Sequence, residues 1–269
     1  MRKLFILLFF TMPVLAADHP GSEEFIQRAT SEFGLDEDSV RELLAGAEYQ
    51  QSIVDAISRP AEGKPWHEYR KIFLTKSRIR QGIAFWKEHR DLISQASEKF
   101  GVDEEIIVSI IGVETAYGRI TGRYRTVDAL VTLGFYYPQN LKSDRSGFFS
   151  KELLEYLKLA EEEGLPAGEV KGSYAGAMGM GQFMPSSYRE YAVDLDGDGK
   201  RDLWRSTPDV IGSVANYLHR HGWQPRQPVV RRARASSDAE FDSIPRSLKP
   251  DLTVGEWARK GFTDRKSTR

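Results

Sequence analysis

One glutamate in the sequence has the surroundings that a general acid requires. It follows three isoleucines by seven, four and three residues, so a helix would carry these side chains on one face: Ile107, Ile110, Ile111 and Glu114. Partial burial disfavours an ionised carboxylate, and the partly negative carbonyls near the end of a helix act in the same direction. Both effects raise the pKa, and a carboxyl that stays protonated near neutral pH can protonate the leaving oxygen of a glycoside.

An ion pair is the alternative role for Glu114. Three arginines follow it within a few helical turns, at Arg119, Arg123 and Arg125. A structural ion pair perturbs a carboxyl group just as an active site does. The residues next to Glu114 therefore leave both roles open.

A run of alternating aspartates has the spacing of a calcium loop. Asp194, Asp196, Asp198 and Gly199 match the first, third, fifth and sixth positions of an EF-hand loop. This oxygen-rich spacing suits a hard cation, and we expect a bound calcium ion to stabilise the fold without taking part in catalysis. An acidic turn without metal is the alternative.

The remainder of this loop departs from the EF-hand pattern. The carbonyl of Lys200 and the side chain of Asp202 fall at the seventh and ninth positions. Arg205 stands at the twelfth position, where a bidentate glutamate is expected. Asp209, a little further along the chain, is the candidate replacement.

Hydrophobic periodicity and helix-ending residues predict a mainly α (α+β) chain. The expected helices span about residues 22–33, 37–49, 52–58, 77–100, 103–118, 147–162 and 209–221. The fourth has an apolar stripe formed by Ile79, Ile83, Trp86, Ile93 and Phe100. The fifth is the helix that would carry the candidate acid near its end.

The overall composition excludes several classes of partner. The 38 basic and 39 acidic residues nearly balance, so the net charge indicates neither nucleic acid nor an anionic membrane as partner. Cysteine is absent, which excludes disulfides and a lipid anchor on an N-terminal cysteine. It also argues against zinc at His219 and His221, which we expect to lie at the surface.

The chain divides into four segments by pattern. Residues 1–17 have the order of a secretory signal peptide, with Arg2 and Lys3 before an apolar run that ends in Ala16 and Ala17. An uncleaved short anchor is the alternative. We expect a helical region over 18–97, a core with the calcium loop over 98–224, and a partial C-terminal subdomain over 225–269 with a strand near 229–233. A soluble, exported protein of the bacterial periplasm is the resulting prediction.

Three blocks of sequence resemble, in the same order, the signature segments of the B-type lytic murein transglycosylases of glycoside hydrolase family 103. They are GVDEEIIVSIIGVETAYGRITGRYRTVDALVTLGF, KGSYAGAMGMGQFMPSSYREYAVDLDGDG and IGSVANYLHRHGW. The resemblance implies a lysozyme-like core and a calcium site within it. By position, Glu114 matches the sole catalytic acid/base. Ser173 and Gln182 match residues that line the glycan cleft, with Tyr117 and Asn216 as further candidates, although Ser173 and Gln182 also suit plain turns.

The chemistry that the resemblance implies needs one carboxyl and no cofactor. Glu114 would protonate the oxygen between N-acetylmuramic acid and N-acetylglucosamine in peptidoglycan. It would then take the proton from the muramyl C6 hydroxyl, which attacks C1 and closes a 1,6-anhydro ring. A hydrolase ordinarily needs two carboxylates at the bond.

The sequence departs from the family pattern in two places. Gln139 and Asn140 stand where relatives carry an arginine pair, and Arg145 is the candidate substitute in recognising the acidic stem peptide. An aromatic segment with a Tyr-Asn pair, which completes the cleft in relatives, does not occur before Arg269. A muramidase that uses water, and a non-catalytic calcium-stabilised peptidoglycan-binding protein, therefore remain alternatives.

Overall fold

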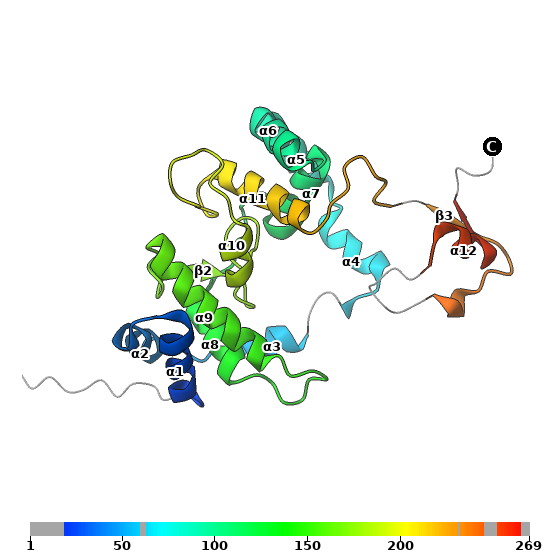
Figure 1. The fold of residues 1–269 in the computed structure, drawn as a ribbon. Helices are drawn as coiled ribbons and strands as arrows, with labels where there is room; N and C mark the ends of the chain where they lie inside the picture. The colour runs from blue at the N-terminus through cyan, green and yellow to red at the C-terminus, as the bar shows by residue number, and fades with distance from the viewer. Residues whose placement is uncertain (1–18, 60–62, 231, 245–251, 265–269) are drawn as a thin grey trace, which may run out of the picture. The chain divides into compact units, whose positions relative to one another are not determined.

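The structure is a computed structural model that describes residues 19–59, 63–230, 232–244 and 252–264. Residues up to Gln224 form one compact unit, and those from Pro225 onward form a second (Figure 1). The expected signal peptide, residues 1–17, lies outside the described residues. No described helix is long and apolar enough to cross a lipid bilayer.

The first unit is helical, as predicted. Its described elements are α1 (Ser22–Phe33), α2 (Glu37–Ala45), α3 (Gln51–Ser58), α4 (Trp66–Phe73), α5 (Lys76–Glu88), α6 (Arg90–Phe100), α7 (Glu104–Thr115), β1 (Tyr124–Arg125), α8 (Thr126–Phe135), α9 (Ser146–Glu163), β2 (Lys171–Gly172), α10 (Pro185–Tyr191) and α11 (Thr207–Arg220). The two strands pair with each other and form the one sheet described in this unit.

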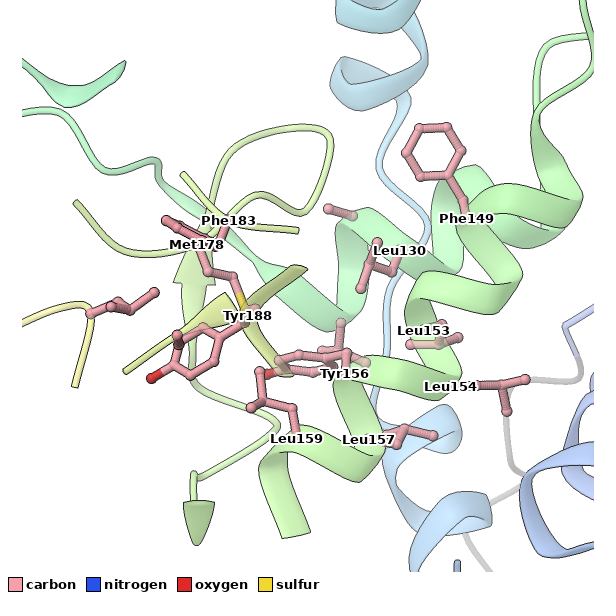
Figure 2. Packing of buried hydrophobic residues seen from close by; sticks show 14 of the residues in the cluster. Leu130, Phe149, Leu153, Leu154, Tyr156, Leu157, Leu159, Met178, Phe183 and Tyr188 are labelled. Atoms are coloured by element: carbon pink, nitrogen blue, oxygen red, sulfur yellow. The ribbon is translucent and has the colours of Figure 1, made fainter. Parts of the chain in front are cut away.

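Two helices pack together at the centre of the core. Every residue of α8 from Thr126 to Leu133 is buried, whereas α9 buries one face against it. Figure 2 shows Leu130 of α8 beside Leu153 of α9, with Tyr156 and Leu159 further along α9. The sequence patterns did not predict α8, because a helix that is buried all round has no polar face to reveal its period.

The single helix expected over 77–100 is wrong. His89 has φ −111° and ψ 26°, which separates α5 from α6. The break shifts the phase of the apolar stripe, so Ile79 and Ile83 are 55% and 51% exposed, whereas Gly82 and Phe85 face the core. The five apolar residues form one continuous stripe only if α5 and α6 are treated as a single helix.

The helix that carries Glu114 is shorter at its end than expected. It stops at Thr115 instead of Gly118, and Ala116 already has the left-handed conformation. Asp103 precedes its first residue but does not cap it through the side chain. The carboxylate of Asp103 accepts a hydrogen bond of 3.1 Å from Nε1 of Trp223 instead, which ties the start of α7 to the segment after α11.

A short antiparallel insert faces the end of α7. Strand β1 pairs with β2 in the register Tyr124 to Gly172, and isolated bridges join Gly172 to Met178 and Met178 to Phe183. The chain from 171 to 183 thus folds back on itself twice. This places residues 181–184 in front of the last turn of α7, where they form part of the site described below.

The second unit is small. Its described residues form β3 (Ala233–Ala235), the 3₁₀ turn η2 (Phe241–Ser243), α12 (Val254–Arg259) and β4 (Phe262–Asp264), with β3 antiparallel to β4. The expected strand at 229–233 is therefore displaced, because pairing with β4 begins only at Ala233. Phe262 packs edge-on against Phe241 and Trp257, at centroid distances of 5.3 and 5.5 Å.

A substitution at Gly122 tests how closely the backbone of the loop after α7 approaches the insert at Gly172. Its φ is +105°, and a Cβ at this position would lie 1.9 Å from the carbonyl oxygen of Gly172. We expect Gly122→Ala to lower the free energy of unfolding by at least about 2 kcal/mol, since strain and a backbone clash add. Urea denaturation measures the change. Gly147→Ala in α9, where a Cβ meets open space, is the control, and equal effects of the two substitutions would contradict the close approach.

Candidate active site

Glu114 lines a hollow of about 250 Å³ between α7, the insert and α11. The wall opposite α7 is formed by residues 181–184, and α11 contributes Val214, Tyr217 and Leu218. Glu114 is the single carboxylic acid in this lining, which is otherwise mostly apolar. The hollow therefore combines one carboxyl group with a mostly apolar wall in which Gln182, Ser187 and Tyr217 are the other polar side chains.

The carboxyl of Glu114 has neither a hydrogen bond nor an ion pair among the described residues. Its side chain is more open to solvent than the sequence predicted, yet the surrounding cleft atoms displace enough water that desolvation raises its pKa above 4.5. The ion-pair alternative is wrong, because Arg125 binds Asp128 at 2.7 Å and Arg123 donates to the Tyr124 hydroxyl. A raised pKa increases the protonated share of Glu114 at any given pH.

Thr115 joins the end of α7 to the opposite wall of the cleft. Thr115 is 1% exposed, and its hydroxyl donates to the carbonyl of Met180 at 2.8 Å. The same oxygen accepts a hydrogen bond of 3.0 Å from the backbone N–H of Gly118. Because Glu114 precedes Thr115 and Gly181 follows Met180, this one hydroxyl sets the spacing between the carboxyl and the facing wall.

Tyr117 does not line the hollow that contains Glu114. The chain reverses through three left-handed residues, with φ of 53° at Ala116, 61° at Tyr117 and 79° at Gly118. This turn directs the Tyr117 ring between α5 and α7, where a Cβ on either Gly82 or Gly112 would lie 2.3 Å from its hydroxyl oxygen. Burial raises the pKa of this phenol. In this structure Tyr117 makes a packing contact between two helices, and its role in binding substrate stays a prediction.

Gln182 does line the hollow, as the sequence predicted. It has a left-handed backbone, with φ of 51°. Its side-chain Nε2 donates to the carbonyls of Thr121 at 3.1 Å and Gly179 at 3.0 Å. The first contact joins the insert to the loop after α7, and the second lies within the insert. Oε1 is therefore the atom of this amide that remains to accept a hydrogen bond from a ligand.

Ser173 and Asn216 make structural contacts outside the hollow. The hydroxyl of Ser173 accepts hydrogen bonds from the backbone N–H groups of Ala175 and Ala177, at 3.3 and 3.1 Å. Asn216 donates through Nδ2 to the carbonyl of Tyr191 at 2.7 Å, which fixes α11 to α10. Tyr217, the residue after Asn216, lines the hollow instead. Only the packing of α11 determines which of these two adjacent side chains faces the hollow.

The acidic loop brings together three of the predicted calcium ligands. Oxygens of Asp194, Asp196 and Asp209 lie within 4.8 Å of one another, and Asp209 is fully buried. Burial, and to a smaller extent the charge of Asp196, raises the pKa of Asp209 against the opposing backbone hydrogen bonds from Leu195 and Asp202. A buried carboxylate beside two others is a donor set that a hard cation neutralises.

The other two aspartates of the loop use an oxygen to fold it. Asp198 accepts from the backbone N–H of Lys200 at 2.9 Å. Asp202 accepts from the backbone N–H groups of Trp204 and Arg205, at 2.9 and 3.0 Å.

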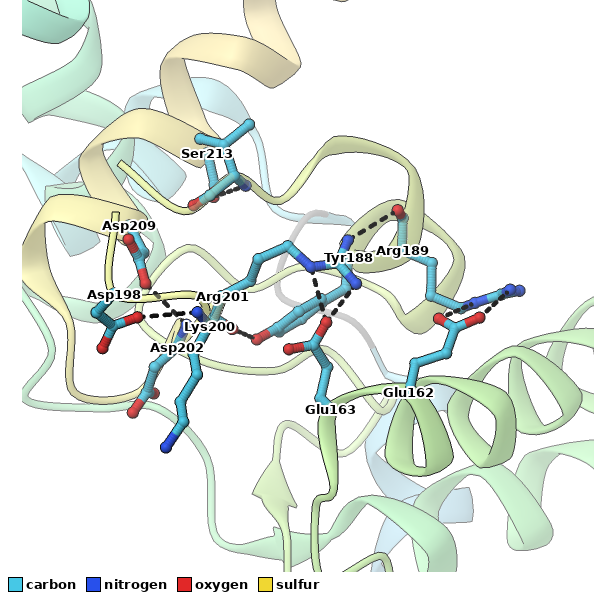
Figure 3. Close-up of polar contacts among 11 residues, drawn as sticks. Glu162, Glu163, Tyr188, Arg189, Asp198, Lys200, Arg201, Asp202, Asp209 and Ser213 are labelled. Carbon is cyan, nitrogen blue, oxygen red and sulfur yellow. Dashed lines mark hydrogen bonds and ion pairs between the residues drawn. The ribbon is translucent and has the colours of Figure 1, made fainter. Parts of the chain in front are cut away.

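One ion pair fastens this loop to α9, between the Arg201 guanidinium and Glu163. Arg189 of α10, the helix that precedes the loop, binds Glu162 of α9 at 2.8 Å (Figure 3). The Tyr188 hydroxyl donates to the carbonyl of Arg201. The loop is therefore held from the α9 side independently of any metal. His219 and His221 are both exposed, as predicted, and neither belongs to a group of possible metal ligands among the described residues.

Residues 17–269 match the family model described as the transglycosylase SLT domain. The chain belongs to this family. It is 38% identical over 257 residues to the membrane-bound lytic murein transglycosylase B of Escherichia coli strain K12, which covers 92% of this chain and 68% of that protein.

Solved structures of lytic transglycosylases have the same fold as this family member. The crystal structure of soluble lytic transglycosylase SltB1 from Pseudomonas aeruginosa is 46% identical with a TM-score of 0.84, covering 91% of this chain and 82% of that one. Escherichia coli Slt35 in complex with calcium is 38% identical with a TM-score of 0.81, covering 93% and 77%. The predicted family, helix-rich fold and enzyme class are confirmed.

Thr115 can be tested by removing its hydroxyl alone. We expect Thr115→Val to lower kcat at least about tenfold, because the lost hydrogen bonds leave the Met180 carbonyl and the Gly118 N–H unpaired and free the cleft wall to move. Thr115→Ser keeps both bonds and should restore kcat. Turnover of purified murein measures the effect.

Thr126→Val is the matched control for that experiment. Thr126 is equally buried, and its hydroxyl has no hydrogen-bond partner among the described residues. This substitution should leave kcat unchanged. A Thr115→Val protein with full kcat, or a Thr115→Ser protein as slow as Thr115→Val, would contradict the positioning role.

Proposed function

We propose that this protein is a lytic transglycosylase that cleaves the β-1,4 bond between N-acetylmuramic acid and N-acetylglucosamine in peptidoglycan, with Glu114 as acid and then base. The observation that carries this proposal is the Glu114 carboxyl, which has a raised pKa, has no ion pair among the described residues, and is the one carboxylic acid in the lining of the cleft. Family membership supports it. Glycan strands are the proposed partner, and no cofactor takes part in the chemistry.

The first step uses Glu114 in its protonated form. The carboxyl donates its proton to the bridging oxygen, the bond between that oxygen and C1 of the muramyl sugar breaks, and the N-acetylglucosamine leaves with a hydroxyl. Positive charge then develops at C1, beside the carboxylate that has just formed. Desolvation favours this step because it makes the ionised Glu114 less stable before the reaction than it is beside the cationic sugar.

The second step returns the proton to Glu114. The carboxylate takes the proton of the muramyl C6 hydroxyl, whose oxygen attacks C1 and closes the 1,6-anhydro ring. The enzyme ends in its starting protonation state, and no water is consumed. Gln182, through Oε1, and the hydroxyl of Tyr217 are the proposed polar contacts to the glycan, because both residues line the hollow.

Hydrolysis is the second candidate reaction, and the lining of the cleft argues against it. Retaining and inverting glycosidases place two carboxyl groups on either side of the bond. Among the described residues that line the hollow, Glu114 has no such partner. A mechanism in which the substrate supplies its own nucleophile fits one carboxyl.

We also propose that Asp194, Asp196 and Asp209 hold calcium, with the Lys200 carbonyl, Asp198 and Asp202 as further ligands. The buried position of Asp209 supports this set, and Slt35 is a relative solved with calcium. The ion would stabilise the loop between α10 and α11 and so the position of α11, which lines the cleft. No proton transfer passes through it.

The proposed segments of the chain follow the sequence prediction. They are a signal peptide at 1–17, a helical region at 18–97, the catalytic core at 98–224 and a partial subdomain at 225–269. Export by the signal peptide would place the enzyme in the periplasm, where its proposed substrate lies.

The role of Glu114 predicts the outcome of one conservative substitution. Glu114→Gln keeps the shape of the side chain but can neither donate nor accept the catalytic proton, so we expect at least about a thousandfold loss of turnover. Mass spectrometry of muropeptides released from purified peptidoglycan should detect 1,6-anhydromuramyl products from the unsubstituted protein only.

Glu105→Gln is the matched control, because Glu105 is an exposed glutamate in the first turn of the same helix. It should release products at the normal rate. Reducing muramyl ends would establish hydrolysis instead, and binding of glycan without any products would establish a non-catalytic protein.

If Asp196 binds calcium, Asp196→Asn should affect the unfolding temperature differently with and without the ion. Without calcium, Asp196→Asn should unfold at the same temperature as the unsubstituted protein or higher, because the charge of Asp196 disfavours ionised Asp209. With calcium, the unfolding temperature of the unsubstituted protein should rise by several degrees, whereas that of Asp196→Asn should not. Differential scanning calorimetry measures both, and Asp91→Asn in α6, an exposed acid, should respond like the unsubstituted protein. A calcium response that Asp196→Asn leaves intact would refute the ligand set.

A further inference from the structure

Glu152 of α9 is a buried acid that neither the proposed reaction nor the proposed calcium site uses. It is 3% exposed, although a buried carboxylate loses the hydration that stabilises its charge. Glu155, Glu162 and Glu163, later on the same helix, pair with arginines. Glu152 has no ion pair among the described residues, so hydrogen bonds must compensate for its burial.

One residue occupies both oxygens of the Glu152 carboxylate. Oε2 accepts a hydrogen bond of 2.9 Å from the backbone N–H of Ser186, and Oε1 accepts one of 2.6 Å from the Ser186 hydroxyl. Hydrogen bonds to a charged acceptor are stronger than neutral ones. Ser186 is the second residue of α10, so this pair of bonds fixes the start of α10 to α9.

Glu152 supplies a cap that the chain before α10 does not provide. Met184, at the N-cap position, makes no side-chain hydrogen bond to the helix. Pro185, the first helical residue, has no N–H to donate. The backbone N–H of Ser186 is therefore the first donor of α10, and an unpaired donor at a helix end costs free energy. Its partner comes from a different helix.

Ser186 lies in the part of the chain that borders the hollow at Glu114. Met184, two residues before it, and Ser187, directly after it, both line that hollow. A shift of Ser186 would therefore move groups that face the cleft. Glu152 controls the position of these groups from behind, without lining the hollow itself.

The Glu152 contact is the counterpart of the Thr115 contact at the other end of the cleft wall. Thr115 binds the carbonyl of Met180, just before the wall residues 181–184, whereas Glu152 binds Ser186, just after them. Thr115 is also the neighbour of the candidate acid in the chain. The Glu152 contact adjoins only the wall, so the two contacts should affect different kinetic constants.

We propose that Glu152 is a positioning residue that holds the glycan-binding wall of the cleft through Ser186. This proposal rests on the proposed function, because it assigns the wall to glycan binding. Glu152 contacts no substrate and transfers no proton. Desolvation, and no neighbouring charge, raises the pKa of Glu114. Loss of the Glu152 charge should therefore leave the pH dependence of kcat unchanged.

Glu152→Gln tests this role, because an amide nitrogen takes the place of one accepting oxygen and one donor of Ser186 loses its partner. KM for glycan strands should rise at least about fivefold while kcat changes less than about twofold, since lost binding that substrate and transition state share affects KM alone. Initial rates at several glycan concentrations and pH values measure KM, kcat and the pH profile.

Glu155→Gln is the matched control. Glu155 also joins α9 to α10, through Arg189, but Arg189 does not line the hollow. Both substitutions should lower the unfolding temperature, and Glu155→Gln should leave KM unchanged. An unchanged KM in Glu152→Gln, or an equal rise of KM in both variants, would overturn the proposal, because Glu152 would then have a structural role only.

Ser186→Ala is a milder second variant, which decides the question if Glu152→Gln does not fold. It removes the hydroxyl donor and keeps the backbone hydrogen bond to Glu152. KM should rise at least about twofold, because one carboxylate oxygen loses its buried partner. An unchanged KM in a folded Ser186→Ala protein would overturn the proposal.

A binding measurement separates this proposal from the proposed function. Each protein carries Glu114→Gln to prevent cleavage, and a peptide-free tetrasaccharide of N-acetylglucosamine and N-acetylmuramic acid is titrated by calorimetry. Weaker binding after Glu152→Gln supports the positioning role even if the parent protein cleaves no glycan, in which case the proposed function alone fails. Equal binding with and without Glu152→Gln, or no binding by either protein, overturns the positioning role whatever the activity.

Discussion

The hydrogen bond between the Thr115 hydroxyl and the Met180 carbonyl connects the two halves of the site. On one side α7 ends with Glu114, and on the other side the insert presents residues 181–184. Glu114 has no described hydrogen bond of its own that could fix its carboxyl, so its place depends on the backbone that carries it. A buried, geometrically defined contact one residue away is the most direct means of fixing that backbone.

The turn after Thr115 has a second consequence for the fold. Left-handed residues at 116 to 118 reverse the chain within one turn and direct Tyr117 between α5 and α7. Gly82 and Gly112 leave the space for its hydroxyl, and Phe85 packs on its ring at 5.2 Å. The strain of the turn is thus offset by an aromatic contact that joins the N-terminal helices to the helix of the candidate acid.

The acidic loop is built on opposing electrostatic effects. Burial raises the pKa of Asp209, whereas hydrogen bonds from Leu195 and Asp202 favour its ionised form. The ion pair between Arg201 and Glu163 holds the same loop from the side of α9. The loop is thus held while the carboxylates of Asp194 and Asp196 in the loop and of Asp209 in α11 repel one another. A divalent cation bound at the proposed site would relieve that repulsion and so would stabilise α11, which lines the cleft.

The sequence by itself determined the features that depend on neighbouring residues. These include the amphipathic helices, the place of Glu114 on one of them, and the alternating aspartates. The sequence also named Asp209 as a candidate to complete the acidic loop. Tertiary structure alone decided that Tyr217 rather than Asn216 lines the hollow and that Tyr117 packs between two helices. It also decided that residues 126–135 form a helix, α8, and that α5 and α6 are two separate helices. The physical reason is that burial, ion pairing and close backbone approach are set by residues far apart in the chain, whose meeting no local period or spacing records.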